Sequence, residues 1–214
     1  MPNTFFTGDT HFSHANIIRY CNRPFKDVVE MNETIITNWN EAIAPDDYVY
    51  HLGDWALWRQ HGLTPRDYRR RLNGRIHFIR GNHDKGIEQF KDCFEWIKDY
   101  CEITVEGQSI VLMHYAMRVW NKSHHGSWQL YGHSHGSLPD DPYSRSIDVG
   151  VDCHNFHPVS FAEVQRLMAK KNWQPIDHHG TKQEGGGVGL SREEYAKAER
   201  LRQYRSLAKE FGPV

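Results

Sequence analysis

The sequence predicts an α/β (α+β) domain in which helices pack against buried sheets. Short apolar runs rich in aromatic and β-branched residues recur along the first two thirds of the chain, and segments with helical spacing alternate with them. Many of the short runs also end at glycine followed by a polar residue, which is typical of buried strands that deliver polar side chains at their carboxyl ends. Together these observations indicate a layered domain.

The first half of the chain alternates strands with helices. Strands are predicted at 4–7, 48–52 and 76–79, and helices at 28–43, 64–72 and near 87–94. In the first helix Met31, Ile35 and Trp39 recur at helical spacing before Pro45 breaks the pattern. The second begins at Thr64, a favourable N-cap, with Pro65 at the first helical position.

The second half continues the alternation and then changes character. Apolar runs at 96–105 and 109–113 are separated by a hairpin-like break at 106–108, and further strands are predicted at 128–131 and 146–151, with a helix at 161–171. We therefore expect a catalytic domain at 1–175. A flexible Gly-rich linker is predicted at 176–190, and a helical extension that opens with a capping box at Ser191 is predicted at 191–214.

Composition excludes several classes of protein. The formal net charge is −1, so no overall field draws the chain to nucleic acid or to an anionic membrane. The four cysteines lie far apart without a CxxC pair, which argues against a zinc ribbon or a disulfide framework. Because no secretory leader and no membrane-spanning run is evident, we expect a cytoplasmic protein that does not associate with membranes. No obligate protein partner is expected either.

Histidine is unusually frequent, with 15 residues, and its placement suggests a metal site. Side chains of His, Asp or Asn accompany glycine or end a strand in five places: Gly8-Asp9-Thr10-His11, Gly53-Asp54, Gly81-Asn82-His83-Asp84, His114 and Gly132-His133-Ser134-His135. Residues two apart in an extended segment point the same way, so that each D-x-H or H-x-H pair can converge on metal ions. Imidazole with carboxylate suits Mn, Fe, Zn, Co or Ni, and two such ions about 3.5–4 Å apart can activate water for attack at phosphorus. Asp54 is the natural bridging carboxylate.

In this order the motifs resemble the calcineurin-like metallophosphoesterase superfamily, whose pattern reads D-x-H, G-D, G-N-H-D/E, H and G-H-x-H. Every element is present between Asp9 and His135. The resemblance implies a four-layer α/β/β/α sandwich of two mixed sheets with the site on loops at one end. It also implies hydrolysis by a metal-bridging hydroxide without a covalent enzyme intermediate.

The resemblance assigns roles residue by residue. Asp9, His11 and His135 would bind one divalent metal ion, Asn82, His114 and His133 would bind the other, and Asp54 would bridge them. His83 would face the substrate and stabilise charge or protonate the leaving group, with Asp84 orienting its ring. Manganese is the expected ion, and Fe, Zn, Ni or Co would also suit these ligands.

Substrate contacts are predicted at five further positions. They are His14, Arg19, Arg80, Arg118 and Trp120. An aromatic ring beside cations can stack a base and bind its phosphate, but solvated arginines and an ordinary surface loop explain these residues equally simply. Arg80 belongs to a basic cluster, for which a solvated helix face is the favoured interpretation. The other members are Arg66, Arg69, Arg70, Arg71 and Arg75.

The motifs define the bond chemistry better than the substrate. The expected function is a Mn-dependent phosphodiesterase acting on a nucleotide or a single-stranded nucleic acid. The alternatives are a phosphomonoesterase with the same metal site and, less favoured, a catalytically silent scaffold of the same fold, since such a scaffold would be expected to lose ligands.

Overall fold

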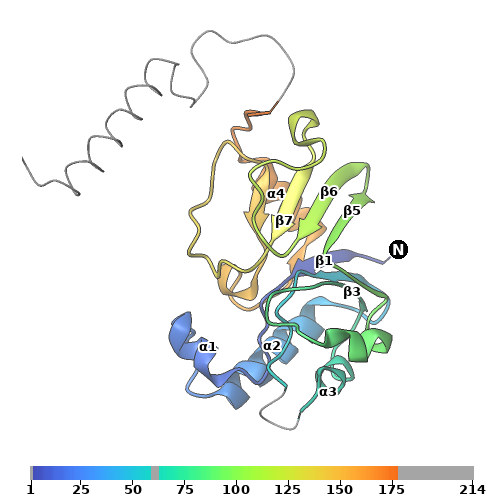
Figure 1. The fold of residues 1–214 in the computed structure, drawn as a ribbon, viewed down its shortest axis with the longest axis vertical. Coiled ribbons are helices and arrows are strands. Elements are labelled where there is room, and N and C mark those ends of the chain that lie inside the picture. Colours follow the sequence, from blue (N-terminus) through green and yellow to red (C-terminus); the bar gives the residue numbers. More distant parts are fainter. Residues whose placement is uncertain (1, 59–62, 178–214) are drawn as a thin grey trace, which may run out of the picture. The chain divides into compact units, whose positions relative to one another are not determined.

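The computed structural model describes residues 2–58 and 63–177, and in these the strands form two sheets (Figure 1). The five-stranded sheet has the order β4-β3-β2-β1-β9, and the four-stranded sheet has the order β5-β6-β7-β8. The first comprises β1 (Thr4–Thr7), β2 (Tyr48–His51), β3 (Arg75–Ile79), β4 (Trp96–Lys98) and β9 (Val159–Ser160). The second comprises β5 (Tyr100–Val105), β6 (Gln108–Met113), β7 (Trp128–Tyr131) and β8 (Ser146–Asp148).

Both sheets are mixed. Strands β1 to β4 run parallel and β9 is antiparallel to β1. In the second sheet β6, β7 and β8 run parallel, and β5 forms an antiparallel hairpin with β6. The expected α/β architecture with two mixed sheets is therefore confirmed.

Helices flank the sheets at positions that the sequence largely predicts. The α-helices are α1 (Ala15–Tyr20), α2 (Val28–Ala42), α3 (Pro65–Arg69) and α4 (Phe161–Met168), and the 3-10 helices are η1 (Ile87–Cys93), η2 (Ser123–His125) and η3 (Val151–Cys153). Helix α2 begins at Asp27, whose side chain accepts a hydrogen bond from the Glu30 N–H, and α3 begins with the predicted Thr64 cap. Within the described ranges, every helix is too short or too polar to cross a bilayer.

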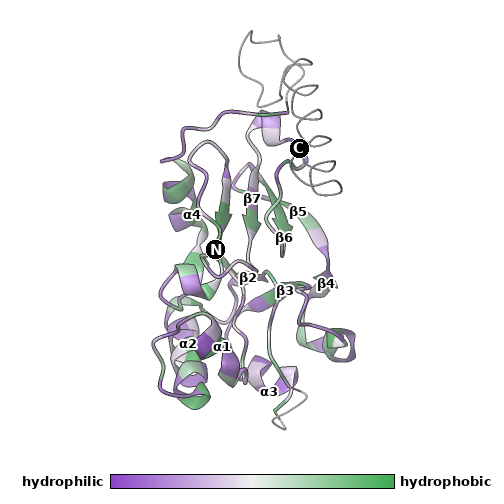
Figure 2. Cartoon of the chain, turned by 60° about the vertical axis from the view of Figure 1, so that its left-hand side comes forward, coloured by the Kyte–Doolittle hydropathy of each residue, from purple (hydrophilic) through white to green (hydrophobic). Residues whose placement is uncertain are grey.

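Successive side chains of a strand point to opposite faces of its sheet, and they contribute to two separate hydrophobic cores. Phe5 packs with α2 on one side of the first sheet, whereas its neighbour Phe6 packs between the sheets with Leu112 and Leu130 of the second. Helix α4 adds Phe161 to this second core. The helices carry both hydrophobic and hydrophilic residues, as expected for elements with one buried side (Figure 2).

Some predicted boundaries were wrong. The apolar run 96–105 is two strands, β4 and β5, which belong to different sheets, because periodicity shows burial and does not reveal the pairing partner. The run 146–151 stays in the sheet only to Asp148, and α4 ends at Met168. The predicted helical extension and the linker from residue 178 onward lie outside the described residues, so the proposed domain organisation remains a prediction.

Candidate metal centre

The predicted ligands follow the carboxyl ends of parallel strands in both sheets. Asp9 follows β1, Asp54 follows β2, Asn82 follows β3, His114 follows β6 and His133 follows β7. Because neighbouring parallel strands end at the same edge of a sheet, these loops meet although they are distant in sequence. The two sheets bring their edges together around the motifs.

The ligand loops are tight turns and not the extended segments that the D-x-H and H-x-H spacing suggested. Five ligands, namely Asp9, His11, Asp54, His133 and His135, have φ values of 48–68°. This left-handed conformation is costly for residues other than glycine, and such strain is concentrated at functional sites. The side chains therefore converge because the backbone turns sharply.

Asp9, His11 and His135 form the first ligand group. Each offers a ligand atom, and these atoms lie within 4.8 Å of one another. The His11 Nε2 atom is buried without a hydrogen-bond partner and lies 3.5 Å from Oδ2 of Asp54. A buried nitrogen without a hydrogen-bond partner is unfavourable unless a bound ion or water molecule interacts with it.

Asp54, His114 and His133 form the second group, again with ligand atoms within 4.8 Å of one another. His114 Nδ1 lies 2.6 Å from the Leu52 carbonyl oxygen, which can only accept, so Nδ1 carries the proton and donates it. In the neutral ring the Nε2 lone pair then faces Asn82 Oδ1 at 3.0 Å and Asp54 Oδ2 at 3.6 Å. Three acceptors that face one another in this way are suited to hold a cation between them.

Burial makes this site electrostatically unfavourable without a cation. Burial, followed by the charges of Asp54 and Asp148, raises the pKa of Asp9 well above its ordinary value. Burial lowers the pKa of His114 to about 4, so the ring is neutral and able to act as a ligand near pH 7. Carboxylates crowded together with neutral imidazoles are ligands that divalent transition-metal ions prefer. The residues of this site therefore fit the divalent ions expected from the sequence motifs.

His83 is exposed at this centre, with its ring centroid 5.4 Å from that of His11. Asp84 is buried, and its carboxylate accepts hydrogen bonds from the backbone N–H groups of Asp54, Trp55 and Gly81 at 2.7–2.9 Å. Burial, followed by the charge of Asp54, raises the pKa of Asp84 to about 6. Asp84 thus joins two ligand loops, and its role in orienting the His83 ring stays a prediction.

The predicted substrate contacts occupy different surroundings. His14 lies at the centre, its Nδ1 atom 3.4 Å from Nδ1 of His11. Arg19 is exposed and lies over the ring of its neighbour Tyr20. Arg118 is exposed, whereas Trp120 is buried and its indole N–H donates to Ser127. A buried ring cannot serve as an open stacking surface.

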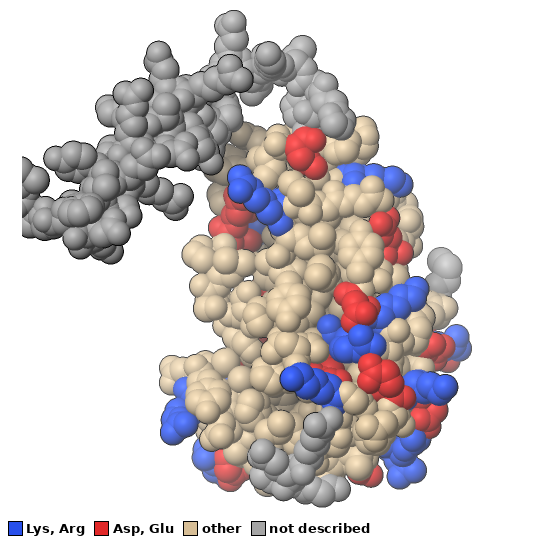
Figure 3. All heavy atoms as spheres, in the orientation of Figure 1, with Lys and Arg blue, Asp and Glu red and all other residues tan. Residues whose placement is uncertain are grey.

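Arginines of the basic cluster form ion pairs with acidic groups. Arg80 pairs with Glu88 at 2.7 Å and with Asp99, and Arg71 forms a bidentate pair with Glu33. Blue and red groups lie next to each other on the face that Figure 3 shows. This pairing supports the solvated interpretation of the cluster and weakens the case for Arg80 as a phosphate ligand.

Sequence reasoning missed two residues behind the centre, the buried Arg23 and the partly buried Asp152. Asp152 accepts a hydrogen bond from His135 Nδ1 at 2.7 Å and forms an ion pair with Arg23, also at 2.7 Å. Although burial raises the pKa of Asp152, the hydrogen bonds from His135 and Arg23 outweigh it and hold the pKa below its ordinary value. A signal was available for Asp152 alone: it directly follows the strand predicted at 146–151, with Gly150 two residues before it, whereas nothing in the sequence marks Arg23.

The chain is similar to proteins from distant organisms. It is 39% identical over 175 residues to the uncharacterized protein MJ1445 of Methanocaldococcus jannaschii, a match that covers 79% of this chain and 93% of that protein. It is 27% identical to the Gene 66 protein of Mycobacterium phage L5, covering 71% and 87% respectively. A solved structure, the protein of unknown function AQ665 from Aquifex aeolicus, matches with a TM-score of 0.62 and 27% identity, over 78% of this chain and all of that one.

The family comparison agrees with the fold and the ligand groups. The family model of the calcineurin-like phosphoesterase superfamily domain matches residues 4–145, which include every predicted metal ligand. The chain therefore belongs to the calcineurin-like phosphoesterase superfamily, which implies a hydrolase of phosphate esters that uses divalent metal ions.

Proposed function

We propose that the protein is a dinuclear-metal phosphodiesterase, with manganese as its working ion, that acts on a nucleotide or a nucleic-acid strand. The position of Asp54 supports the dinuclear site most directly. Its Oδ2 atom lies 3.5 Å from Nε2 of His11 in the first ligand group and 3.6 Å from Nε2 of His114 in the second. A carboxylate oxygen between two groups of ligands is suited to bridge two ions.

The protein side chains supply the remaining chemistry. Two divalent ions in such a site activate a water molecule and neutralise charge on the phosphate. His83, exposed beside the first ligand group, is placed to donate a proton to the leaving oxygen, and its backbone N–H donates to Asp54 Oδ1 at 2.9 Å. The same loop therefore presents the proton donor and anchors the bridging carboxylate.

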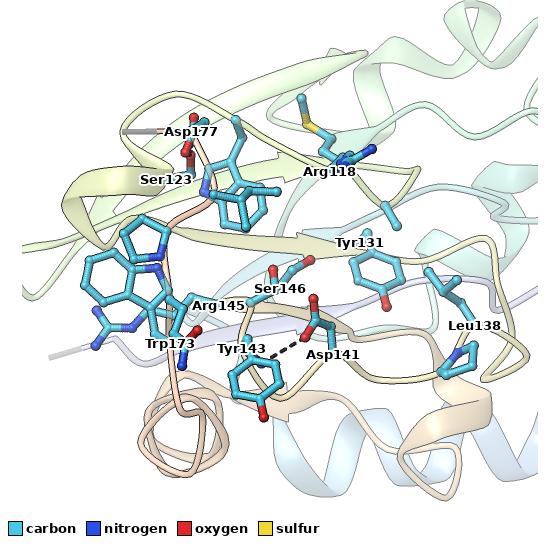
Figure 4. Close-up of a pocket in the computed structure, with 18 residues that line it drawn as sticks. Arg118, Ser123, Tyr131, Leu138, Asp141, Tyr143, Arg145, Ser146, Trp173 and Asp177 are labelled. Carbon is cyan, nitrogen blue, oxygen red and sulfur yellow. Dashed lines mark hydrogen bonds between the residues drawn. The ribbon is translucent and has the colours of Figure 1, made fainter. Parts of the chain in front are cut away.

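A cavity of about 380 Å³ would receive the organic part of the ester. Its lining includes Met117, Tyr131 and Leu138, each two or three residues from a histidine of the metal centre, so the Cα atoms lie within about 11 Å of those ligands. In Figure 4, Arg118 and Tyr131 lie on one side of the cavity, and Trp173 and Asp177 on the other. Aromatic rings with a cation and carboxylates suit a nucleoside attached to phosphate.

The test compares a diester with a monoester. Protein stripped by a chelator and reloaded with Mn²⁺ should hydrolyse bis-p-nitrophenyl phosphate faster than p-nitrophenyl phosphate. His83→Ala should lower kcat by about 10²–10⁴-fold for a dinucleotide diester, whose alkoxide leaving group needs a proton, and much less for bis-p-nitrophenyl phosphate, whose p-nitrophenolate leaves without one. Metal content should stay unchanged, because the substitution removes no ligand.

The other results separate the rival functions. Turnover of the monoester alone would overturn the diester proposal and favour a phosphomonoesterase. Metal-loaded protein that turns over neither ester, nor a panel of nucleotide diesters, would favour a scaffold of this fold.

A further inference from the structure

A buried ionic network lies directly behind the first ligand group. The Arg23 side chain has no exposed surface and that of Asp152 is 8% exposed. Nε and Nη2 of Arg23 donate to the two carboxylate oxygens of Asp152 at 2.8 and 2.7 Å, a bidentate geometry. Buried charges are expensive unless every hydrogen bond is made, so this pair is a specific feature and not an incidental surface contact.

Arg23 also holds the backbone of the D-x-H loop. Nη2 donates to the carbonyl oxygen of Asp9 at 2.7 Å, and Nη1 donates to that of Thr10 at 3.2 Å and to the Met31 sulfur at 3.4 Å. Asp9 and His11 in this loop have left-handed φ values of 56° and 49°. A backbone in this conformation persists only when its surroundings hold it there, and Arg23 supplies two of those hydrogen bonds.

Asp152 sets the orientation of the third ligand of the same group. Its Oδ2 atom accepts from Nδ1 of His135 at 2.7 Å, which leaves Nε2 of that ring as the free lone pair. A carboxylate that accepts a hydrogen bond from the other ring nitrogen of a metal-binding histidine fixes the orientation of the ring and makes it a better ligand. In the second ligand group the Leu52 carbonyl does the same for His114, so that group is supported independently.

We propose that Arg23 and Asp152 are positioning residues for one metal position only, the one formed by Asp9, His11 and His135. The pair contacts two of these three ligands directly, through the Asp9 carbonyl and the His135 ring. It makes no hydrogen bond to Asp54, His114 or His133 among the described residues. The inference rests on the dinuclear proposal and adds that the two positions have separate supports.

The test measures metal affinity and needs no turnover. Calorimetric titration of chelator-stripped protein with Mn²⁺ should resolve two sites in the wild type. Asp152→Asn, which keeps the shape but removes the charge, should weaken one site by about 10–100-fold and leave the other unchanged. Arg23→Lys, which loses the bidentate fork, should weaken the same site. Glu33→Gln is the matched control, because it alters a bidentate arginine pair on the surface.

Each other result counts against a specific proposal. Equal weakening of both sites by Asp152→Asn, or no weakening, overturns the positioning role, and urea unfolding of the metal-free variants shows whether the fold has survived. If the wild type binds a single ion, the dinuclear proposal fails. In that case the positioning role stands only if Asp152→Asn weakens binding of that ion.

Discussion

At the scale of single residues, the metal centre depends on positions that have no side chain. A Cβ atom on Gly81 would lie 2.2 Å from Asp54 Oδ1, and one on Gly53 would lie 2.7 Å from His114 Nδ1. Gly53 also has a φ of 95°, which side chains rarely permit. These glycines allow loops from different strands to approach one another closely enough to share ions.

Gly81→Ala should therefore displace the carboxylate of Asp54, the ligand that we propose as the bridge. We expect metal affinity to fall by about 10–100-fold, similar to the loss of a residue that supports a ligand, with the fold retained. Titration with Mn²⁺ monitored by calorimetry measures the change. Gly8→Ala is the matched control beside Asp9, since its new Cβ atom would meet Leu52 at an ordinary contact distance of 3.5 Å. Equal effects of the two substitutions would contradict this explanation.

At the scale of elements, the sequence predicted which side chains would lie close together better than it predicted the residues that support them. Glycine followed by Asp, Asn or His after a strand marks a ligand loop, and this local pattern is visible without a structure. The contact between Arg23 and Asp152 joins residues 129 positions apart, and neither lies in a recognised motif. Similarly, the run 96–105 contains nothing that reveals its passage from one sheet to the other. Pairings of this kind depend on tertiary structure.

The loops around the 380 Å³ cavity allow a test at the same scale. Tyr143 lines it and is 51% exposed, so its ring is available for stacking. Tyr143→Ala should raise KM for thymidine 5′-p-nitrophenyl phosphate about tenfold, because stacking on one base contributes about 1–3 kcal/mol. Hydrolysis of bis-p-nitrophenyl phosphate, which carries no nucleoside, should not change.

A second tyrosine provides the control for that experiment. Tyr100 is 39% exposed on β5 and lies outside the cavity lining, so Tyr100→Ala should leave both substrates unaffected. If Tyr143→Ala alters neither KM, the nucleoside does not lie in this cavity. A change with both substrates would instead indicate a general disturbance of the centre.

At the scale of the whole molecule, the metal centre lies where the two sheets meet. Ligands from the first sheet (Asp9, Asp54) and from the second (His114, His133) belong to separate sets of strands that share the core around Phe6, Leu112 and Leu130. Ions bound by both sets, as we propose, would connect the sheets. Metal binding should consequently stabilise the fold as well as serve the reaction.

Removal of metal should lower the melting temperature. At a free Mn²⁺ concentration 100 times the dissociation constant, binding to the native state stabilises it by about 2.7 kcal/mol, which corresponds to about 5–10 °C for a domain of this size. Without the ion, burial and then the charge of Asp54 raise the pKa of Asp9, because a carboxylate at this position is poorly solvated and lies near a second one. Differential scanning calorimetry before and after chelation, and after Mn²⁺ is restored, measures the change.

Asp54→Asn separates the two contributions to that stability. The amide removes the repulsion with Asp9 while its Oδ1 can still accept from the His83 N–H. The metal-free variant should therefore melt above metal-free wild type, yet gain less than wild type from added Mn²⁺, because it lacks the bridging charge. A wild-type melting temperature unchanged by chelation, or an equal gain from Mn²⁺ in both proteins, would mean that the ions do not connect the two sheets through Asp54.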